Sequence, residues 1–202
     1  EVLQKTIFPL GELKKESVRQ IAKENKLITS NKKDSTGICF IGERPFPEFV
    51  GNYLSGQQGN IINENDDVIG IHQGLVFYTL GQRQGVGIGG VKGSPDLPWY
   101  VAKKNLKTNE LLCVQGNDHP LLFSRELSTK NLFKLEDSLP TSFEGTAKVR
   151  YRQEDQGCEI YVEDNALNIK FLNPQRSVTP GQSVVIYKNN KCLGGGEICT
   201  IN

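Results

Sequence analysis

The 202-residue sequence contains no methionine and only two histidines, His72 and His119. Because it does not begin with Met, we expect a fragment, a processed chain or a truncated protein. Five cysteines are present, yet none forms a C-x-x-C pair. This spacing argues against a zinc site and against a dithiol oxidoreductase, since both chemistries use closely spaced ligands or thiols. We therefore expect no bound metal.

Long hydrophobic runs are also missing. No stretch approaches the roughly 18–20 apolar residues needed to span a bilayer, and no charged-then-apolar leader suggests secretion. We therefore expect no membrane partner, a cytoplasmic location and reduced thiols rather than a disulfide framework. Hydrophobic residues make up 37% and charged residues 23% of the chain, which is ordinary for a globular protein able to bury a core.

Charge is nearly balanced, at +1 for the whole chain. Residues 1–44 carry a net +3, residues 45–118 a net −2, and residues 119–202 carry equal numbers of each sign. A uniformly basic domain is excluded, so any surface that binds nucleic acid must be local.

The hydrophobic periodicity changes once along the chain. Residues 10–28 have helical spacing, and their apolar stripe (Leu13, Val18, Ile21, Ala22 and Leu27) should dock on something, because such a helix is marginal alone. We predict a short helix or turn at 48–54, and then strands at 60–62, 68–71, 75–80, 99–104, 110–116, 145–152, 158–162, 167–171, 183–187 and 192–201. Residues 119–141 are polar and suggest no strand.

This order predicts a mainly β protein: an N-terminal helix and loop, then a small antiparallel β domain and a C-terminal β-barrel. We place the three domains at residues 1–48, 49–118 and 119–202. The glycines of "CLGGGEI", residues 192–198, indicate a bulge or barrel corner. Four cysteines within strand-like patterns are expected to be structural: Cys113, Cys158, Cys192 and Cys199.

The run "GVGIGG", residues 85–90, formally matches G-x-G-x-x-G. A dinucleotide site requires a helix to begin at these glycines, whereas Gly93, Pro95 and Pro98 follow at once. A glycine-rich hairpin or a close backbone approach explains the run better. The neighbouring Gln82, Arg83 and Gln84 are candidates for RNA contact.

The segment "KVRYRQ", residues 148–153, alternates as a strand would. Lys148, Arg150 and Arg152 would then share one face and could contact phosphates. Tyr151, on the other face, would pack in the core or stack on a base. The alternative is a solvated charged face.

One cysteine stands apart in "KDSTGICFIGERPF", residues 33–46. Cys39 follows Gly37 and lies near Lys32, Lys33 and Arg44 in sequence, and nearby cations favour a reactive thiolate. The residues alone leave two interpretations open, a nucleophile on a flexible loop or a small buried hydrophobe.

The sequence of this loop resembles that of the second-cysteine loop of the tRNA-specific 2-thiouridylases. Further stretches resemble that family, in its order: "FPLGELKKESVRQIAKENKL", "GIHQGLVFYTLGQRQGVGIGG", "PWYVAKKN", "VRYRQ", "TPGQSVVIY" and "CLGGGEI". The resemblance extends over essentially the whole chain but over only the later part of the family's sequence. The family's ATP-binding domain, with its "SGGVDS" loop and first catalytic cysteine, has no counterpart here.

The resemblance implies a sulfurtransferase that moves persulfide sulfur to C2 of the tRNA wobble uridine. It makes Cys39 the persulfide carrier, and it makes Arg150, Tyr151 and Gln182 contacts to tRNA. ATP with Mg²⁺ would be bound by the N-terminal domain and not by this chain, which alone should be inactive. The implied partners are tRNA, through its anticodon stem-loop, and a sulfur-donor protein. The alternative is an RNA-binding β module in which Cys39 has no catalytic role.

Overall fold

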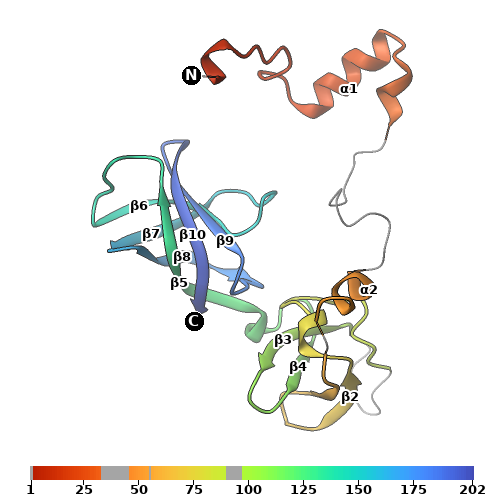
Figure 1. The fold of residues 1–202 in the computed structure, drawn as a ribbon. Helices are drawn as coiled ribbons and strands as arrows, with labels where there is room; N and C mark the ends of the chain where they lie inside the picture. Colours follow the sequence, from red (N-terminus) through yellow and green to blue (C-terminus); the bar gives the residue numbers. More distant parts are fainter. Residues whose placement is uncertain (1, 33–45, 55, 90–96) are drawn as a thin grey trace. The chain divides into compact units, whose positions relative to one another are not determined.

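The computed structural model describes residues 2–32, 46–54, 56–89 and 97–202. Two compact units are present, Glu1–Pro45 and Phe46–Asn202 (Figure 1). Cys39 and the loop around it lie outside the described residues. Within those residues, no helix has both the length and the apolar character required to cross a membrane.

The first unit is built around helix α1, Lys15–Glu24, with short 3-10 turns at Leu3–Lys5 (η1) and Ile28–Asn31 (η2). The helix is shorter than the predicted range 10–28. It begins after Lys14, whose backbone is extended, and left-handed Lys26 follows its end. The Arg19 side chain donates to the carbonyl of Lys32 at 3.1 Å and ties the chain after η2 to the helix.

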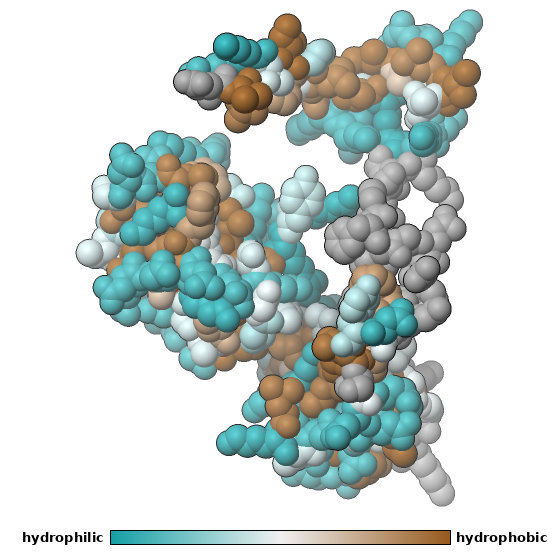
Figure 2. Space-filling view, in the orientation of Figure 1, coloured by the Kyte–Doolittle hydropathy of each residue, from teal (hydrophilic) through white to brown (hydrophobic). Residues whose placement is uncertain are grey.

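The apolar stripe of this unit is not buried by any described residue. No residue of α1 is buried. Leu13, Ile21 and Leu27 are 41%, 44% and 52% exposed, and Figure 2 shows hydrophobic side chains on the surface of the unit. The predicted docking partner of the stripe is therefore not found within the described part of residues 1–45.

The second unit opens with helix α2 and a four-stranded sheet in the order β2-β1-β4-β3. The prediction of a purely antiparallel sheet is wrong, because β1 and β4 pair in parallel with Ile61 opposite Leu111. Residues 75–80, predicted as a strand, contain none: Leu75–Phe77 form a 3-10 turn after Gly74, whose φ is +135°. The elements are α2 (Phe46–Gly51), β1 (Gly59–Ile62), β2 (Val68–His72), η3 (Leu75–Phe77), β3 (Trp99–Asn105) and β4 (Glu110–Gln115).

His72 in this sheet is fully buried and has a structural role. Its Nδ1 accepts a hydrogen bond from the backbone N–H of Gly74 at 3.0 Å. Its Nε2 lies 3.0 Å from the carbonyl oxygen of Asn109 and therefore donates to it. Both ring nitrogens are occupied, so the imidazole holds two loops together.

A closed six-stranded barrel follows, in the order β10-β5-β8-β7-β6-β9 (Figure 1). The predicted fold class, mainly β with an N-terminal helix and a C-terminal barrel, is confirmed. Strand β5 was not predicted, because its polar sequence suggested a loop. After the 3-10 turn η4 (Pro120–Leu122), the strands are β5 (Phe123–Lys134), β6 (Ser142–Lys148), β7 (Gln156–Glu163), β8 (Ala166–Arg176), β9 (Ser183–Lys188) and β10 (Lys191–Ile201).

The barrel closes around side chains that alternate inward along each strand. Ile160, Leu167 and Ile186 are fully buried. Thr129, the one polar residue of β5 that is buried, accepts a hydrogen bond from the Leu167 N–H at 2.8 Å through Oγ1. The core comprises Leu127, Leu132, Ala147, Val149, Cys158, Ile160, Leu167, Ile169, Phe171, Val178, Val184, Ile186, Leu193 and Ile198.

The glycines of β10 mark a bulge, as predicted. The pairing of β10 with β9 shifts register between Cys192 and Gly194. Gly194 has a φ of +143°, and a Cβ at this position would collide with the carbonyl oxygen of Phe133 on β5. The strand bends here because only glycine fits the close backbone approach.

Candidate nucleic-acid interface

The loop between β6 and β7 carries the predicted phosphate contacts, but it is not a strand. Strand β6 ends at Lys148, and Val149–Arg152 form a bend and turn. The Gln153 side chain accepts from the Val149 N–H at 3.0 Å, and the Gln153 N–H bonds to the carbonyl of Arg150 at 3.1 Å. These local bonds replace the hydrogen bonds that a strand would make to its neighbours. The prediction of three cations on one strand face is therefore wrong.

Arg150 reaches from this turn to the loop that joins β8 to β9. Its Nη2 donates to the carbonyl oxygen of Ser177 at 3.3 Å. Ser177 is buried with a left-handed φ of +54°, and its carbonyl also accepts from the Thr179 hydroxyl at 3.1 Å. The backbone N–H of Ser177 bonds to the carbonyl of Leu122 at 2.7 Å. The acceptor for Arg150 is therefore held in a fixed position.

The same loop presents Gln182. The N–H of Gly181 donates to the carbonyl of Ile198 at 2.8 Å, and the Ile198 N–H returns a bond to the carbonyl of Gln182 at 2.7 Å. This pair of bonds fastens the loop to β10. The backbone of Gln182 is thus used in the barrel while the residue remains exposed.

A hollow of about 700 Å³ joins these pieces, and all three predicted tRNA contacts lie in its lining. Tyr151 is 95% exposed, so it does not pack in the core. Strand β9 lines the hollow with its outward side chains Ser183, Val185 and Tyr187. The full lining is Lys148, Val149, Arg150, Tyr151, Gly181, Gln182, Ser183, Val185 and Tyr187.

The cations around the hollow differ in their partners. Lys148 Nζ lies 2.8 Å from Asp155 Oδ1, and this hydrogen bond raises the pKa of the lysine. The same ammonium lies 5.7 Å from the centre of the Tyr187 ring. Within the described ranges, Arg150 and Arg152 form no ion pair with a carboxylate. Their charge is therefore available to an anion.

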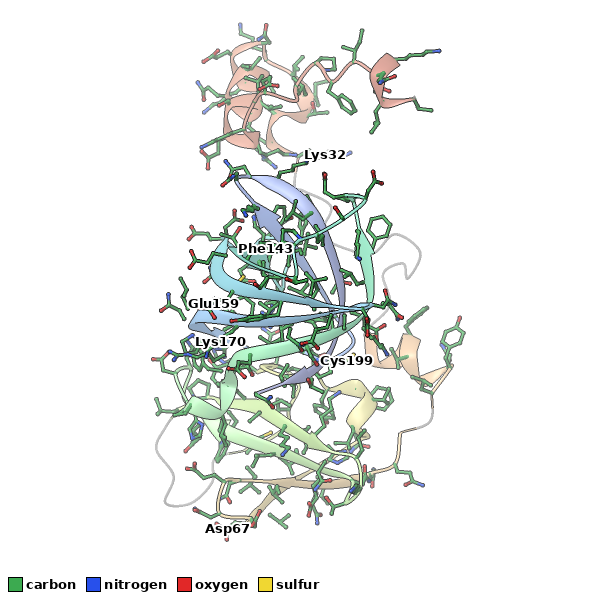
Figure 3. All side chains as sticks on the ribbon, turned by 90° about the vertical axis from the view of Figure 1, so that its left-hand side faces the viewer. Lys32, Asp67, Phe143, Glu159, Lys170 and Cys199 are labelled. Atoms are coloured by element: carbon green, nitrogen blue, oxygen red, sulfur yellow. The ribbon has the colours of Figure 1, made fainter. Side chains whose placement is uncertain are left out.

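On another wall of the barrel, by contrast, the charged side chains pair with one another. Glu159 on β7 lies opposite Lys170 on β8 (Figure 3). Lys170 Nζ is also 3.8 Å from a carboxylate oxygen of Glu126 on β5. Charges on this wall pair across strands, as is typical of a solvated face, whereas Arg150 at the hollow has no carboxylate partner among the described residues.

The hollow combines an exposed aromatic ring, a guanidinium without a carboxylate and an exposed amide. Such a set suits stacking on a base and contact with a phosphate. Its lining contains no cysteine. The thiols of Cys113 and Cys158 are buried, and burial raises the pKa of each to about 12. Among the described residues, no cluster of three or more His, Cys, Asp and Glu could hold a metal ion.

The glycine run and its neighbours lie outside this hollow. Gly85 and Gly87 adopt positive φ, and residues 85–89 begin no helix, whereas a dinucleotide site requires a helix to begin at these glycines. The side chain of Gln82 is used locally: it accepts from the Thr79 N–H and donates to the Gln84 carbonyl, both at 2.9 Å. Of the three polar candidates, Gln82 is thus committed to the turn.

Some residues of the interface were missed in the sequence. The alternation of "SVVIYK" could have placed Ser183, Val185 and Tyr187 on the outer face of a barrel strand. No sequence signal marks Ser177 as the acceptor for Arg150, because that contact joins loops 27 positions apart.

Three family models match the chain. Residues 1–43 match the tRNA methyl transferase HUP domain, residues 47–115 the tRNA methyl transferase PRC-barrel domain, and residues 124–198 the aminomethyltransferase beta-barrel domain. The last of these includes the loops that carry Arg150 and Gln182. Together the three matches leave only short stretches of the chain uncovered.

Curated relatives extend the comparison to nearly the whole chain. The tRNA-specific 2-thiouridylase MnmA of Francisella tularensis subsp. tularensis (strain WY96-3418) is 56% identical over 200 residues. The enzymes of that name from subsp. holarctica (strain LVS) and subsp. novicida (strain U112) show the same identity. Each alignment covers 98% of this chain and 56% of the relative, so the chain spans about half the length of these relatives. The chain belongs to the family of tRNA-specific 2-thiouridylases.

Proposed function

We propose that this chain is the part of a tRNA 2-thiouridylase that binds tRNA and delivers sulfur to C2 of the wobble uridine. The observation that supports the proposal best is the convergence of Arg150, Tyr151 and Gln182 on one exposed hollow. These residues come from two loops that the barrel brings together. The relatives, 56% identical, are named as enzymes of this activity.

Cys39 is the proposed sulfur carrier. A cysteine persulfide suits the task because its terminal sulfur is a soft nucleophile, which a second thiol can release by disulfide exchange. The described thiols Cys113 and Cys158 are poor candidates, since a pKa of about 12 keeps them protonated at neutral pH. The second thiol of the reaction is assigned to the upstream domain of the family.

ATP and Mg²⁺ do not fit the described residues. The glycines of residues 85–89 begin no helix whose N-terminus could hold a phosphate, and no acidic cluster for a metal is present within the described ranges. We therefore assign ATP-dependent activation of the uridine to the upstream domain and derive no step for it from this chain.

A tRNA-binding assay with matched variants tests the interface. Arg150→Ala should weaken tRNA binding by about tenfold, the usual cost of losing a charged contact, and lower the slope of log Kd against log salt by about one. Arg125→Ala is the control: it removes another exposed arginine of the barrel that does not line the hollow, so tRNA binding should not change. Equal binding by wild type and both variants would remove the interface from consideration.

Tyr151 offers an independent test of stacking. Tyr151→Ala should weaken binding by about five- to hundredfold, since stacking on one base contributes roughly 1–3 kcal/mol. Tyr151→Phe keeps the ring and should bind as the wild type does. Equal losses in the two variants would mean that the hydroxyl, not the ring, makes the contact.

The rival proposal is an RNA-binding module without a catalytic role. Cys39→Ser in protein that includes the upstream domain separates the two. Loss of thiolation with intact tRNA binding supports the sulfur-carrier role, whereas unchanged thiolation supports the binding module. We further propose that the 202-residue chain alone, given ATP and a sulfur donor, produces no thiolated tRNA, which mass spectrometry of the tRNA nucleosides would check.

The remaining assignments follow the same proposal. Residues 1–48, 49–118 and 119–202 are proposed as a catalytic-loop segment, a central β domain and a tRNA-binding barrel. A cytoplasmic location and a sulfur-donor protein as partner accompany the reaction.

A further inference from the structure

A glutamine is buried in the barrel wall behind the Arg150 turn. Gln175, near the end of β8, is only 4% exposed. Burying an amide is costly unless its groups find partners. Here Oε1 accepts from Gln153 Nε2 at 2.7 Å, and Nε2 donates to the Asn173 carbonyl at 2.7 Å and to Gln156 Oε1 at 3.2 Å. The amide is therefore fully used.

The hydrogen bonds continue outward to the candidate interface. Gln153, which donates to Gln175, accepts from the backbone N–H of Val149 at 3.0 Å. Gln156 in turn donates to the carbonyl of Glu154 at 3.0 Å. One connected amide chain thus runs from the barrel wall to the residue immediately before Arg150, and it spans the whole loop from β6 to β7.

Besides the backbone bond from the Gln153 N–H to the Arg150 carbonyl and the Lys148–Asp155 ion pair, the turn that presents Arg150 and Tyr151 has two side-chain anchors. The first is the bond from Arg150 to the carbonyl of Ser177, and the second is the amide chain through Gln153 and Gln175. Between them, Tyr151 and Arg152 are exposed and form no side-chain hydrogen bond within the described residues. The direction of these two side chains therefore depends on how the backbone of the turn is held.

We propose that Gln175 and Gln153 are positioning residues for RNA binding: they hold the Arg150–Tyr151 turn in its binding conformation before RNA arrives. The inference rests on the proposed function of the hollow and assigns roles that the family resemblance did not. Without the amide chain, the RNA would have to order the turn itself and would bind more weakly.

The two single variants and the double variant test this role. Gln175→Leu leaves Gln153, Gln156 and the Asn173 carbonyl without their partner, so it should lower the melting temperature. Gln153→Leu with Gln175→Leu removes both members of the central bond, but it also leaves the Val149 N–H without its acceptor, so it should not restore the melting temperature. Positioning predicts that each single variant and the double variant bind tRNA about two- to tenfold more weakly, the loss expected from one net hydrogen bond.

Binding measured on fully folded protein distinguishes positioning from a merely structural role. If the glutamines only stabilise the barrel, each variant should bind tRNA as the wild type does at a temperature well below its own melting temperature. If they position the turn, binding stays weak at that temperature, and the losses of the two single variants are not additive in the double variant. The half-buried Gln153→Leu keeps the test valid should Gln175→Leu fail to fold.

A matched control breaks a similar bond elsewhere. Gln73→Leu removes the 2.8 Å bond from Gln58 Nε2 in the loops beside the small sheet, and tRNA binding should not change. Wild-type binding by the glutamine variants, with Arg150→Ala still impaired, would overturn the positioning role and leave the proposed function standing. If Arg150→Ala also bound normally, the proposed function itself would fail.

Discussion

The barrel buries its apolar residues, whereas the N-terminal segment leaves its own apolar residues at least partly exposed. Six strands close on a core in which Ile160 and Ile186 have no exposed surface, whereas no described residue of 2–32 is buried. Both sequences are patterned for burial. The difference teaches that the pattern needs a partner: the barrel supplies its own second face, and the helix stripe does not find one within its unit. The match of residues 1–43 to a HUP domain model suggests where that face belongs.

The largest expected difference between the two regions comes from truncating one isoleucine in each. Ile160→Ala should lower the free energy of unfolding by about 2–5 kcal/mol, because it leaves a cavity in a packed interior. Ile21→Ala, on the exposed stripe, should change it by less than about 0.5 kcal/mol. Urea denaturation followed by circular dichroism measures both. Similar losses would mean that the stripe is covered after all.

The next largest loss of stability is expected from adding a side chain at a glycine of β10. Gly194→Ala should cost about 1–3 kcal/mol, as overpacking does, because the new Cβ collides with the Phe133 carbonyl and the φ of +143° is unsuited to alanine. Gly89→Ala, where nothing lies within 4 Å of the new atom, is the control and should be nearly neutral. Thermal unfolding distinguishes them, and a silent Gly194→Ala would contradict the tight β5–β10 approach.

The buried thiols of Cys113 and Cys158 allow burial in the second unit to be tested chemically. Burial raises the pKa of Cys113 and of Cys158 to about 12 from 9.0. The unfolded chain therefore releases these protons at lower pH than the folded chain does, and stability should fall as pH rises from about 9 toward 12. At pH 8 neither thiol should react with iodoacetamide until the protein is denatured. Peptide mass spectrometry reads the labelling, and rapid native modification of Cys158 would contradict its burial.

The smallest expected effect is also informative. Removing residues 1–32 should leave the melting temperature of the barrel unchanged, because the segment and the barrel belong to separate compact units. Differential scanning calorimetry of the shortened and intact chains checks this. A marked drop would show that the exposed stripe stabilises the second unit.

The alternation of polar and apolar residues predicted most of the barrel. Strands β7 and β9 lie close to their predicted ranges because their buried positions are apolar and follow every second residue. Strand β5 was missed because Thr129, not an apolar residue, occupies an inward position, and left-handed Asn131 interrupts the alternation. Such positions are determined by neighbouring strands rather than by the segment itself.

The candidate site was predicted in its members but not in its geometry. Arg150, Tyr151 and Gln182 came from the family resemblance, and they line one hollow. The predicted strand through Arg152 ends at Lys148, because a glutamine side chain captures the N–H of Val149. Alternating residues cannot show that competition. The parallel contact of β1 with β4 was equally hidden, since it depends on the intervening chain.

That parallel pair has a consequence for biosynthesis. Ile61 must wait for Leu111, its partner fifty positions later, before the middle of the sheet can form. At about 5–20 residues per second, a ribosome takes roughly 3 to 10 seconds to deliver it. Throughout that interval the nascent strand β1 can pair only with its hairpin neighbour β2, so one of its edges stays open to chaperones or to a neighbouring polypeptide.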